Sequence, residues 1–243
     1  AVKPGAPQLW PEAPGNIGFD WSAPADPDGK KQAALERAFK DAAHVVKVEL
    51  VNQRLVVASL EPRIATASYD AQAKRYTLRC PTQGFASVRG QVAGAMNIKP
   101  DELHIQTEDV GGAFGMKGWA YPEYIAMLHG ARVLGKPIHW VSTRSEAFVT
   151  DNQGRDSFWT VELALSARGK FLGLRVDCIG NVGAYFTGVA HFCVTTHISG
   201  CLPTVYDIPV AQLNTRCVMT NTVPTGPYRG AGRPEASYLI ERV

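Results

Sequence analysis

Alternating apolar and polar residues predict most of the strands in this chain. Every second residue is apolar between positions 159 and 165, and the same alternation returns between positions 172 and 178. Arg168-Gly169 lies between the two segments and suits a tight turn, so the pattern predicts a long β-hairpin. Further strands are predicted at residues 45–51, 55–59, 64–69, 75–80, 103–107, 137–141 and 210–219.

Helical spacing and helix-boundary residues predict four helices. They cover residues 30–40, 85–96, 122–135 and 234 to the chain end. Pro122 and Pro234 suit a first helical turn, and Gly135 suits a helix end. Strands interleaved with helices, together with the long hairpin, predict an α+β fold in which helices flank mixed β-sheets, rather than a doubly wound sheet.

The N-terminal segment differs from the rest of the chain in its proline content. Residues 1–29 hold six of the sixteen prolines. Proline fixes φ and has no backbone N–H to donate, so this segment is predicted to be an extended arm or linker. The expected organisation is a proline-rich connector with a short helix over residues 1–43, followed by a domain over 44–243. Residues 180–206 are expected to be irregular.

Composition and charge exclude several classes of protein. The chain has 25 Lys and Arg against 22 Asp and Glu, and 45% of its residues are hydrophobic. This balance predicts a folded core and no nucleic-acid partner, and no apolar run approaches the roughly 20 residues of a membrane helix. The five cysteines form no Cys-x-x-Cys pair, and their odd number favours a reducing, cytoplasmic compartment.

Three segments carry candidate chemistry, and each precedes a predicted helix. The most informative is the glycine-rich segment Asp109–Lys117, whose backbone N–H groups could approach an anionic ligand. The second is Tyr228–Glu235, which contains Arg229, and the third is Pro81–Gly84, whose Gln83 amide could donate to an oxo or carbonyl group. A tight strand-to-helix connection, a solvated arginine and a helix-entry residue remain the respective alternatives. Together the three segments could converge on one phosphate-bearing ligand.

Two histidines beside Cys193 and Cys201 raise the question of a metal site. His191 and His197 flank Cys193, but no carboxylate falls at a familiar ligand spacing. Ordinary packing or loop roles are therefore favoured, and no metal-ligand cluster is predicted.

The order of several motifs resembles one enzyme family. The motifs are Leu60-Glu61-Pro62-Arg63, Ser68-Tyr69-Asp70, Thr82-Gln83-Gly84, Asp109–Lys117, Gly183-Ala184-Tyr185, Tyr206-Asp207-Ile208-Pro209 and Thr220–Glu235. This order is similar to that of the molybdopterin-binding large subunits of the aldehyde oxidase, xanthine dehydrogenase and carbon monoxide dehydrogenase group, the molybdenum hydroxylases. The resemblance runs from about Val45 to the end, and it implies that the chain is a fragment of such a subunit.

The resemblance implies a share of a molybdenum cofactor site. The expected cofactor-binding residues are Gln83, Gly84, Gly112, Ala113, Phe114, Gly115 and Arg229. The molybdenum is expected to be held by the pterin dithiolene, so no protein residue is a metal ligand; the cytosine dinucleotide is one expected form of the cofactor. Iron–sulfur clusters and FAD are expected on partner subunits or domains. The implied reaction is hydroxylation of a carbon centre with water as the oxygen source.

Departures from the family pattern bear on the substrate. Gly230 takes the place of the copper-binding cysteine of carbon monoxide dehydrogenases, which disfavours CO oxidation. Gly118 and Ala231 replace larger pocket residues of purine oxidisers, and His197 falls near a pocket arginine, so an aldehyde or an N-heterocycle is the expected substrate. The catalytic glutamate of the family is expected beyond Val243, which would leave the isolated chain inactive. The alternative is a non-catalytic assembly or interaction module that retains the fold.

Overall fold

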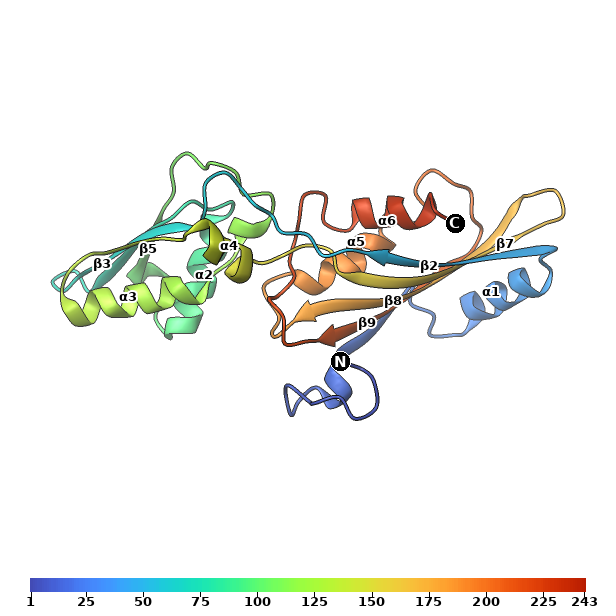
Figure 1. Ribbon diagram of the computed structural model, residues 1–243, viewed down its shortest axis with the longest axis horizontal. Helices are drawn as coiled ribbons and strands as arrows, with labels where there is room; N and C mark the ends of the chain where they lie inside the picture. Colours follow the sequence, from blue (N-terminus) through green and yellow to red (C-terminus); the bar gives the residue numbers. More distant parts are fainter. The chain divides into compact units, whose positions relative to one another are not determined.

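The two terminal segments of the chain meet in one β-sheet, and the middle of the sequence forms a second sheet of its own. A computed structural model describes residues 1–243. Unit 1 consists of Ala1–Leu55 and Gln153–Val243, and unit 2 consists of Val56–Asn152. Both units combine a sheet with helices (Figure 1), so the predicted α+β class is confirmed.

Unit 1 is built on a five-stranded sheet with the order β1-β9-β8-β7-β2. Its strands are β1 (Ile17–Ala23), β2 (His44–Asn52), β7 (Ser157–Leu165), β8 (Phe171–Gly183) and β9 (Ala211–Met219). The hairpin β7–β8 is antiparallel, as predicted, with Gly169 at φ 75° in its turn. Strand β9 runs parallel to β8, and the loop and short helices between them make this crossover possible.

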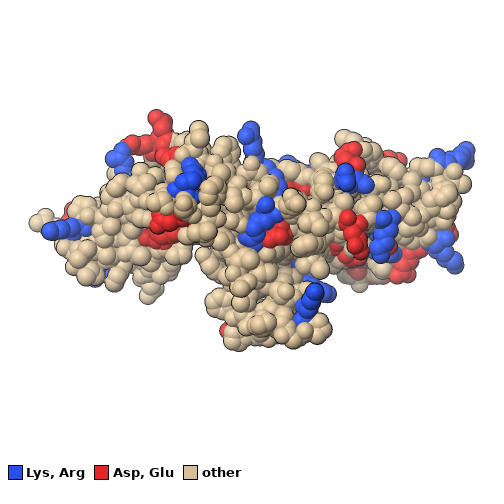
Figure 2. Space-filling model, in the orientation of Figure 1, with Lys and Arg blue, Asp and Glu red and all other residues tan.

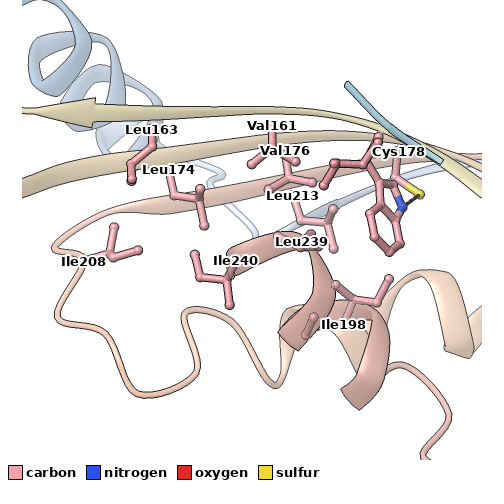
Figure 3. Packing of buried hydrophobic residues seen from close by; sticks show 13 residues of the cluster. Val161, Leu163, Leu174, Val176, Cys178, Ile198, Ile208, Leu213, Leu239 and Ile240 are labelled. Carbon is pink, nitrogen blue, oxygen red and sulfur yellow. Dashed lines mark hydrogen bonds between the residues drawn. The ribbon is translucent and has the colours of Figure 1, made fainter. Parts of the chain in front are cut away.

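The core of unit 1 lies between this sheet and the C-terminal helices. The helices are α5 (Thr196–Ser199) and α6 (Arg233–Ile240). Figure 3 shows the apolar side chains that fill the space between them. The labelled ones are Val161, Leu163, Leu174, Val176, Cys178, Ile198, Ile208, Leu213, Leu239 and Ile240. Alternate residues of the strands face this side, which accounts for the apolar–polar alternation seen in the sequence.

The opposite face of the sheet is covered at one end by α1 (Lys30–Lys40). Leu35 of this helix is buried, and Gly173 of β8 lies against Leu35 and Ala38. A Cβ at Gly173 would come within 3.1 Å of the Ala38 Cβ, so the absence of a side chain lets the helix approach the strand closely. The helix predicted at residues 30–40 is thereby confirmed.

Unit 2 is built on a four-stranded sheet with the order β5-β4-β3-β6. Its strands are β3 (Ile64–Asp70), β4 (Arg75–Arg79), β5 (Leu103–Gln106) and β6 (Ile138–Val141), and its helices are α2 (Phe85–Met96), α3 (Pro122–Leu134) and α4 (Arg144–Thr150). Leu78, Val88, Leu103 and Leu128 are buried in its interior. The predicted helices at 85–96 and 122–135 match α2 and α3, and Gly135 ends α3 at φ 62°.

Four segments differ from the prediction, and one of them is α4 (Arg144–Thr150), a helix that was not predicted. Residues 55–59 form no strand, because only Leu55 makes an isolated bridge, to Gly154. Residues 1–29 are more than an extended arm, since Ile17–Ala23 pairs with β9 as an edge strand, where few backbone donors are needed. Residues 180–206 contain the end of β8, the 3₁₀ helix Ala190–Val194 and α5.

The remaining short elements are 3₁₀ helices at Pro14–Asn16, Pro100–Glu102 and Met116–Gly118. The expected boundary at residue 43 between a connector and a domain stays a prediction. Charged side chains of both signs alternate over the face shown in Figure 2, without a patch of one sign. The helices are all too short or too polar to reach across a lipid bilayer.

Candidate functional site

Unit 2 brings Gln83 and the glycine-rich loop together. Gln83 lies between β4 and α2, and its Oε1 accepts a hydrogen bond of 2.7 Å from the backbone N–H of Gly115. Its own backbone N–H donates to the carbonyl of Lys117 at 3.2 Å. The amide and the loop, which lie more than 30 positions apart in the chain, therefore fix each other's position.

Gly84 and Thr82 complete the junction between β4 and α2. Gly84 is the residue before α2, and its carbonyl accepts from the N–H of Val88 at 3.0 Å. The hydroxyl of Thr82 donates to the Lys117 carbonyl at 2.8 Å and is itself buried. Residues 82–84 are thus anchored to the far end of the glycine-rich loop.

The loop backbone adopts conformations that favour glycine. Gly112 has φ 96° and Gly115 has φ 107°, and Phe114 between them has φ 50°. A Cβ at Gly112 would come within 3.1 Å of the Phe114 ring and 3.3 Å of the Ser59 Cβ. The loop therefore needs glycine at this position both for its dihedral angles and for space.

The donor groups of this loop suit an anionic or oxo-bearing ligand. The backbone N–H groups of Gly112 and Ala113 donate to no acceptor within the protein. Successive unpaired N–H groups in a left-handed turn form a concave site that attracts negative charge. Gly112 and Ala113 thus offer donors of the kind that an anionic ligand needs, and contact with a pterin stays a prediction.

A buried lysine is paired with a partly exposed glutamate at the base of the loop, and sequence reasoning assigned neither residue a role. Lys117 has no solvent-exposed side-chain surface, and its Nζ donates to the carboxylate of Glu61 at 2.6 Å. Both residues stand in the motifs that carry the family resemblance, which was the available signal. A buried lysine is unusual enough to indicate a specific positional role.

A second buried cation lies nearby in unit 2. Arg63 is fully buried, donates to both carboxylate oxygens of Glu123 at 3.0 Å, and donates from Nε to Asp151 at 2.5 Å. Its guanidinium lies 3.7 Å from the centre of the Tyr121 ring. The Tyr121 hydroxyl in turn donates to the carbonyl of Met116, so Arg63 also supports the loop.

Burial and pairing shift the pKa values of this cluster in defined directions. Burial alone would lower the pKa of Arg63, but its hydrogen bonds to Glu123 and the nearby negative charges raise the pKa above the ordinary arginine value. Burial raises the pKa of Asp151, and the hydrogen bond from Arg63 offsets only part of that rise. Burial also raises the pKa of the Tyr121 hydroxyl, so this group remains a donor to Met116 near neutral pH.

Unit 1 brings together the other expected site residues. Arg229 and Ala231 lie in the loop before α6; Arg229 is exposed, and Ala231 has φ 42°. The next residue, Gly232, lies against His197 of α5, and a Cβ at Gly232 would come within 2.4 Å of the His197 Cβ. His197 is therefore adjacent to the segment that carries Arg229 and Ala231.

An ion pair supports this loop as well. Arg155 donates to Glu235 at 2.7 Å, and both side chains are almost completely buried. Arg155 also donates to the carbonyls of Tyr228 and Arg229, while the Glu235 carboxylate accepts from the N–H of Gly232 at 2.8 Å. The pair thereby holds the backbone on both sides of Ala231. Sequence reasoning did not assign either residue a role.

The structure therefore divides the expected site residues into two sets. Gln83, Gly84, Gly112–Gly115 and Gly118 belong to unit 2, and His197, Arg229 and Ala231 belong to unit 1. A Cβ at Gly118 would meet no atom within 4 Å, so the space beside it is open. The five cysteines are free, and burial raises the pKa of Cys80, Cys178, Cys193 and Cys217 to about 12. No group of three or more His, Cys, Asp or Glu side chains is arranged to hold a metal ion.

A family model described as the molybdopterin cofactor-binding domain matches residues 10–243. The chain belongs to this family. The match includes both sets of site residues and reaches into the proline-rich N-terminal segment as far as residue 10, so it includes strand β1, which pairs with β9. The resemblance to molybdenum hydroxylase large subunits is thereby confirmed, and the motif order was a correct guide to the family.

Several characterised proteins are similar to this molybdopterin cofactor-binding domain. Subunit gamma of the 6-hydroxypseudooxynicotine dehydrogenase complex of Paenarthrobacter nicotinovorans is 31% identical over 88% of this chain and 27% of its own length. The carbon monoxide dehydrogenase large chain of Hydrogenophaga pseudoflava is 33% identical over 100% of this chain and 31% of its own length. The crystal structure of quinoline 2-oxidoreductase from Pseudomonas putida 86 superposes with a TM-score of 0.80 at 27% identity, over 93% of this chain and 29% of that one.

These relatives place the molybdopterin-binding domain within a family of oxidoreductases. The chain spans less than a third of the length of each. Two of their names denote a subunit or a large chain, so those proteins are parts of assemblies.

Proposed function

We propose that this chain forms part of the molybdenum cofactor site of an enzyme that hydroxylates an aldehyde or an N-heterocycle with water as the oxygen source. The observation that carries the proposal is the loop at Gly112–Gly115, in a chain of the molybdopterin cofactor-binding family. Its glycine-dependent backbone presents unpaired N–H donors beside Gln83. An ordinary strand-to-helix connection requires neither feature.

The expected site residues of unit 2 have different roles in the proposed function. The Oε1 of Gln83 is occupied by the Gly115 N–H, which leaves its NH₂ group to donate to an oxo group. The N–H groups of Gly112 and Ala113 contact the anionic parts of the cofactor, and Phe114 covers it. Gly84 brings the start of α2 close to the ligand. When bound, the cofactor supplies two-electron redox chemistry, and its dithiolene holds the metal without a protein ligand.

Residues of unit 1 contribute a cation and part of the substrate pocket. Arg229 is proposed to lie near the metal centre, where its charge stabilises anionic species. Arg155 donates a hydrogen bond to the Arg229 carbonyl, which fixes the backbone at this position. We assign His197, Ala231 and Gly118 to the substrate pocket. The general base is expected outside these 243 residues.

The substrate class follows from the small pocket residues and from the relatives. Gly118 and Ala231 leave room for a planar ring or an aldehyde, and the open space beside Gly118 supports this. One relative is named for a hydroxypseudooxynicotine and a structural relative for quinoline, which favours an N-heterocycle. The carbon monoxide dehydrogenase relative makes CO an alternative, but Gly230 offers no thiolate to bind copper.

The proposed enzyme works with other redox groups. Iron–sulfur clusters and FAD on partner subunits or domains would carry electrons away, and the cytosine dinucleotide is one form of the pterin cofactor. We place the complex in the cytoplasm, because buried free thiols suit a reducing compartment.

Metal analysis and turnover of the full-length parent polypeptide with its partners test the proposal. We expect molybdenum and pterin in equal amounts, and dye reduction that depends on an aldehyde or on quinoline. Arg229→Ala should lower kcat about 100-fold, the cost of removing one oriented charge from an active site. Arg168→Ala, in the exposed turn of the β7–β8 hairpin, is the matched control and should leave turnover unchanged.

The opposite results would overturn the proposal in distinguishable ways. Folded parent protein without molybdenum or pterin would favour the alternative, an assembly module that retains the fold. Full molybdenum content with unchanged turnover in Arg229→Ala would remove Arg229 from the site and leave the cofactor assignment intact.

A further inference from the structure

The two ends of the glycine-rich loop are tied to the same side chain. Glu61 accepts a hydrogen bond on Oε2 from the N–H of Gly111 at 3.0 Å, where the loop begins. The same Oε2 accepts from Nζ of Lys117 at 2.6 Å, where the loop ends. One carboxylate oxygen therefore closes a loop of seven residues, from 111 to 117, at its base.

Backbone contacts strengthen this closure. The N–H of Glu61 donates to the carbonyl of Gly111 at 3.0 Å, and Lys117 Nζ also donates to the carbonyl of Glu61 at 2.8 Å. A Cβ at Gly111 would lie 2.6 Å from the Glu61 Cβ, so glycine is needed there for the two segments to meet. The contact is specific in both side chains and backbone.

The closure continues from Lys117 to Gln83. The Lys117 carbonyl accepts from the Thr82 hydroxyl and from the Gln83 N–H, and Gln83 Oε1 accepts from the Gly115 N–H. Glu61, Lys117, Gln83 and the loop thus form a closed ring of hydrogen bonds. Such connected networks fix one conformation because each member is oriented by its neighbours.

The energetic balance indicates a positional role. The Lys117 side chain is 0% exposed and that of Glu61 is 29% exposed. Removing an ammonium group from water is costly, and a hydrophobic pair of similar volume would often be as stable. The contacts of Glu61 and Lys117 lie at the two ends of the loop. The pair is therefore better suited to fix the conformation of the loop than to add to the net stability of the fold.

We propose that Glu61 and Lys117 are positioning residues that preform the cofactor-binding loop. The pair, called here the Glu61–Lys117 clasp, holds the loop so that the N–H groups of Gly112 and Ala113 are presented before any ligand arrives. The proposal rests on the proposed function for the identity of the ligand. The preorganisation itself is a property of this chain alone. Lys117 is covered and directed at Glu61, so it acts through the loop backbone and not on the ligand itself.

Amide hydrogen exchange tests the clasp directly. In the cofactor-free parent polypeptide, Lys117→Met should accelerate exchange of the hydrogen-bonded loop amides of Gly115 and Met116 by at least roughly tenfold, because the loop opens locally. Amides of β3 and α3 in the same unit should change much less. The matched control is Arg79→Met with Glu108→Gln, since this ion pair belongs to the same unit but has side chains 56% and 69% exposed. The control should leave loop exchange unchanged.

A double variant separates positioning from general stability. Lys117→Met leaves a half-buried carboxylate without its cation, which lowers stability, whereas Glu61→Gln/Lys117→Met removes that charge and should restore most of the melting temperature. If the clasp positions the loop, exchange at Gly115 and Met116 stays fast in the double variant, and the pterin content of the purified parent stays low. Recovery of slow loop exchange together with the melting temperature would overturn the proposal.

The readouts also distinguish the two proposals from each other. If the wild-type parent contains no pterin, the proposed function fails, while the exchange experiment on the cofactor-free chain still decides whether the clasp orders the loop. If pterin is present and Lys117→Met changes neither loop exchange nor pterin content, the clasp fails and the cofactor assignment stands.

Discussion

The two units of this chain bury very different side chains. The interior of unit 1 is an apolar layer between a five-stranded sheet and α6, in which Trp159, Leu174 and Leu213 are among the largest buried residues. Unit 2 has a smaller sheet, and two of its largest fully buried side chains are charged, Arg63 and Lys117. Apolar packing thus dominates the interior of unit 1, whereas buried ion pairs contribute to the interior of unit 2, where they stabilise loops.

The difference follows the candidate site residues rather than the size of the units alone. In unit 2 both buried cations support the loop around Gly112. Lys117 pairs with Glu61, and Arg63 lies against Tyr121, whose hydroxyl donates to Met116. Unit 1 has a buried pair too, Arg155 with Glu235, and it holds the segment around Arg229. Loops cannot satisfy their backbone groups with a sheet ladder, so polar side chains do it instead. Buried charge in this chain therefore indicates where a loop has to keep one shape.

The largest effect is expected from Arg63. Arg63→Met leaves the carboxylates of Glu123 and Asp151 without their cation, which should lower the free energy of unfolding of unit 2 by about 3–5 kcal/mol. Urea unfolding gives the magnitude, and hydrogen exchange gives the location. Exchange should rise in β3 and α3 and remain slow in β7 and β8 of unit 1.

The pH dependence of the same variant provides an independent check. Burial already raises the pKa of Asp151 in the wild type, and loss of Arg63 raises it further. A carboxyl whose pKa is higher in the folded state binds more protons folded than unfolded. The stability deficit of Arg63→Met should therefore shrink as the pH falls from 7 through the raised folded pKa toward 3.8. A deficit that grows on acidification would contradict the role assigned to Asp151.

A smaller effect is expected from the apolar layer of unit 1. Leu174 is completely buried in β8, and Leu174→Ala should lower the free energy of unfolding by about 3 kcal/mol through lost burial and a cavity. Exchange should rise in β7, β8 and β9, while α3 of unit 2 stays protected. Val205→Ala is the control, because this residue is 88% exposed, and it should change stability by less than about 0.5 kcal/mol. Equal acceleration in both units would show that the two interiors unfold together.

The strands that form the apolar interior of unit 1 could largely be predicted from the sequence. Alternation at 159–165 and 172–178 gave the hairpin and the buried face of its strands, because side chains on a strand alternate between faces. The same rule failed at Leu55–Ser59, where the apolar residues are present but no neighbouring strand pairs with them beyond one bridge. It also missed β1, whose pairing with β9 joins residues almost 200 positions apart. Non-local partners of this kind leave no local pattern.

The candidate site and the buried charged residues that support it could be predicted only in part. Motif order pointed to Gln83, the glycine-rich loop and Arg229 as site residues. Arg63 and Lys117 stand in motifs of the resemblance, but their burial and that of Arg155 could not be predicted. Most lysines and arginines are exposed, and their rare burial depends on partners far away in the chain. Whether the site residues of the two units serve one cofactor stays a prediction for the parent enzyme.

The smallest predicted effect concerns α4. At its C-terminal end, the hydroxyl of Thr150 accepts a hydrogen bond from Arg63. The Thr143 hydroxyl accepts a hydrogen bond from the Glu146 N–H at 3.1 Å, and the Glu146 carboxylate accepts one from the Thr143 N–H at 2.7 Å. These two bonds form a capping box. Its Thr-x-x-Glu spacing is visible in the sequence, although the helix was not predicted. Thr143→Ala should lower the stability of unit 2 by about 1 kcal/mol, and Ser145→Ala in the same turn is the control.

The Thr143 N–H also makes this cap sensitive to acid. Its hydrogen bond lowers the pKa of Glu146 below the ordinary 4.5. A carboxyl with a lowered folded pKa stabilises the fold fully above its unfolded pKa and loses that contribution as the pH falls through the folded value. Glu146→Gln should therefore be less stable than the wild type at pH 7 and equal to it well below pH 4.5. This deficit also shrinks on acidification, but here the wild type loses stability, whereas in Arg63→Met the variant gains stability. Melting temperatures across this range measure it, and a constant difference would show that the carboxylate charge contributes nothing to the cap.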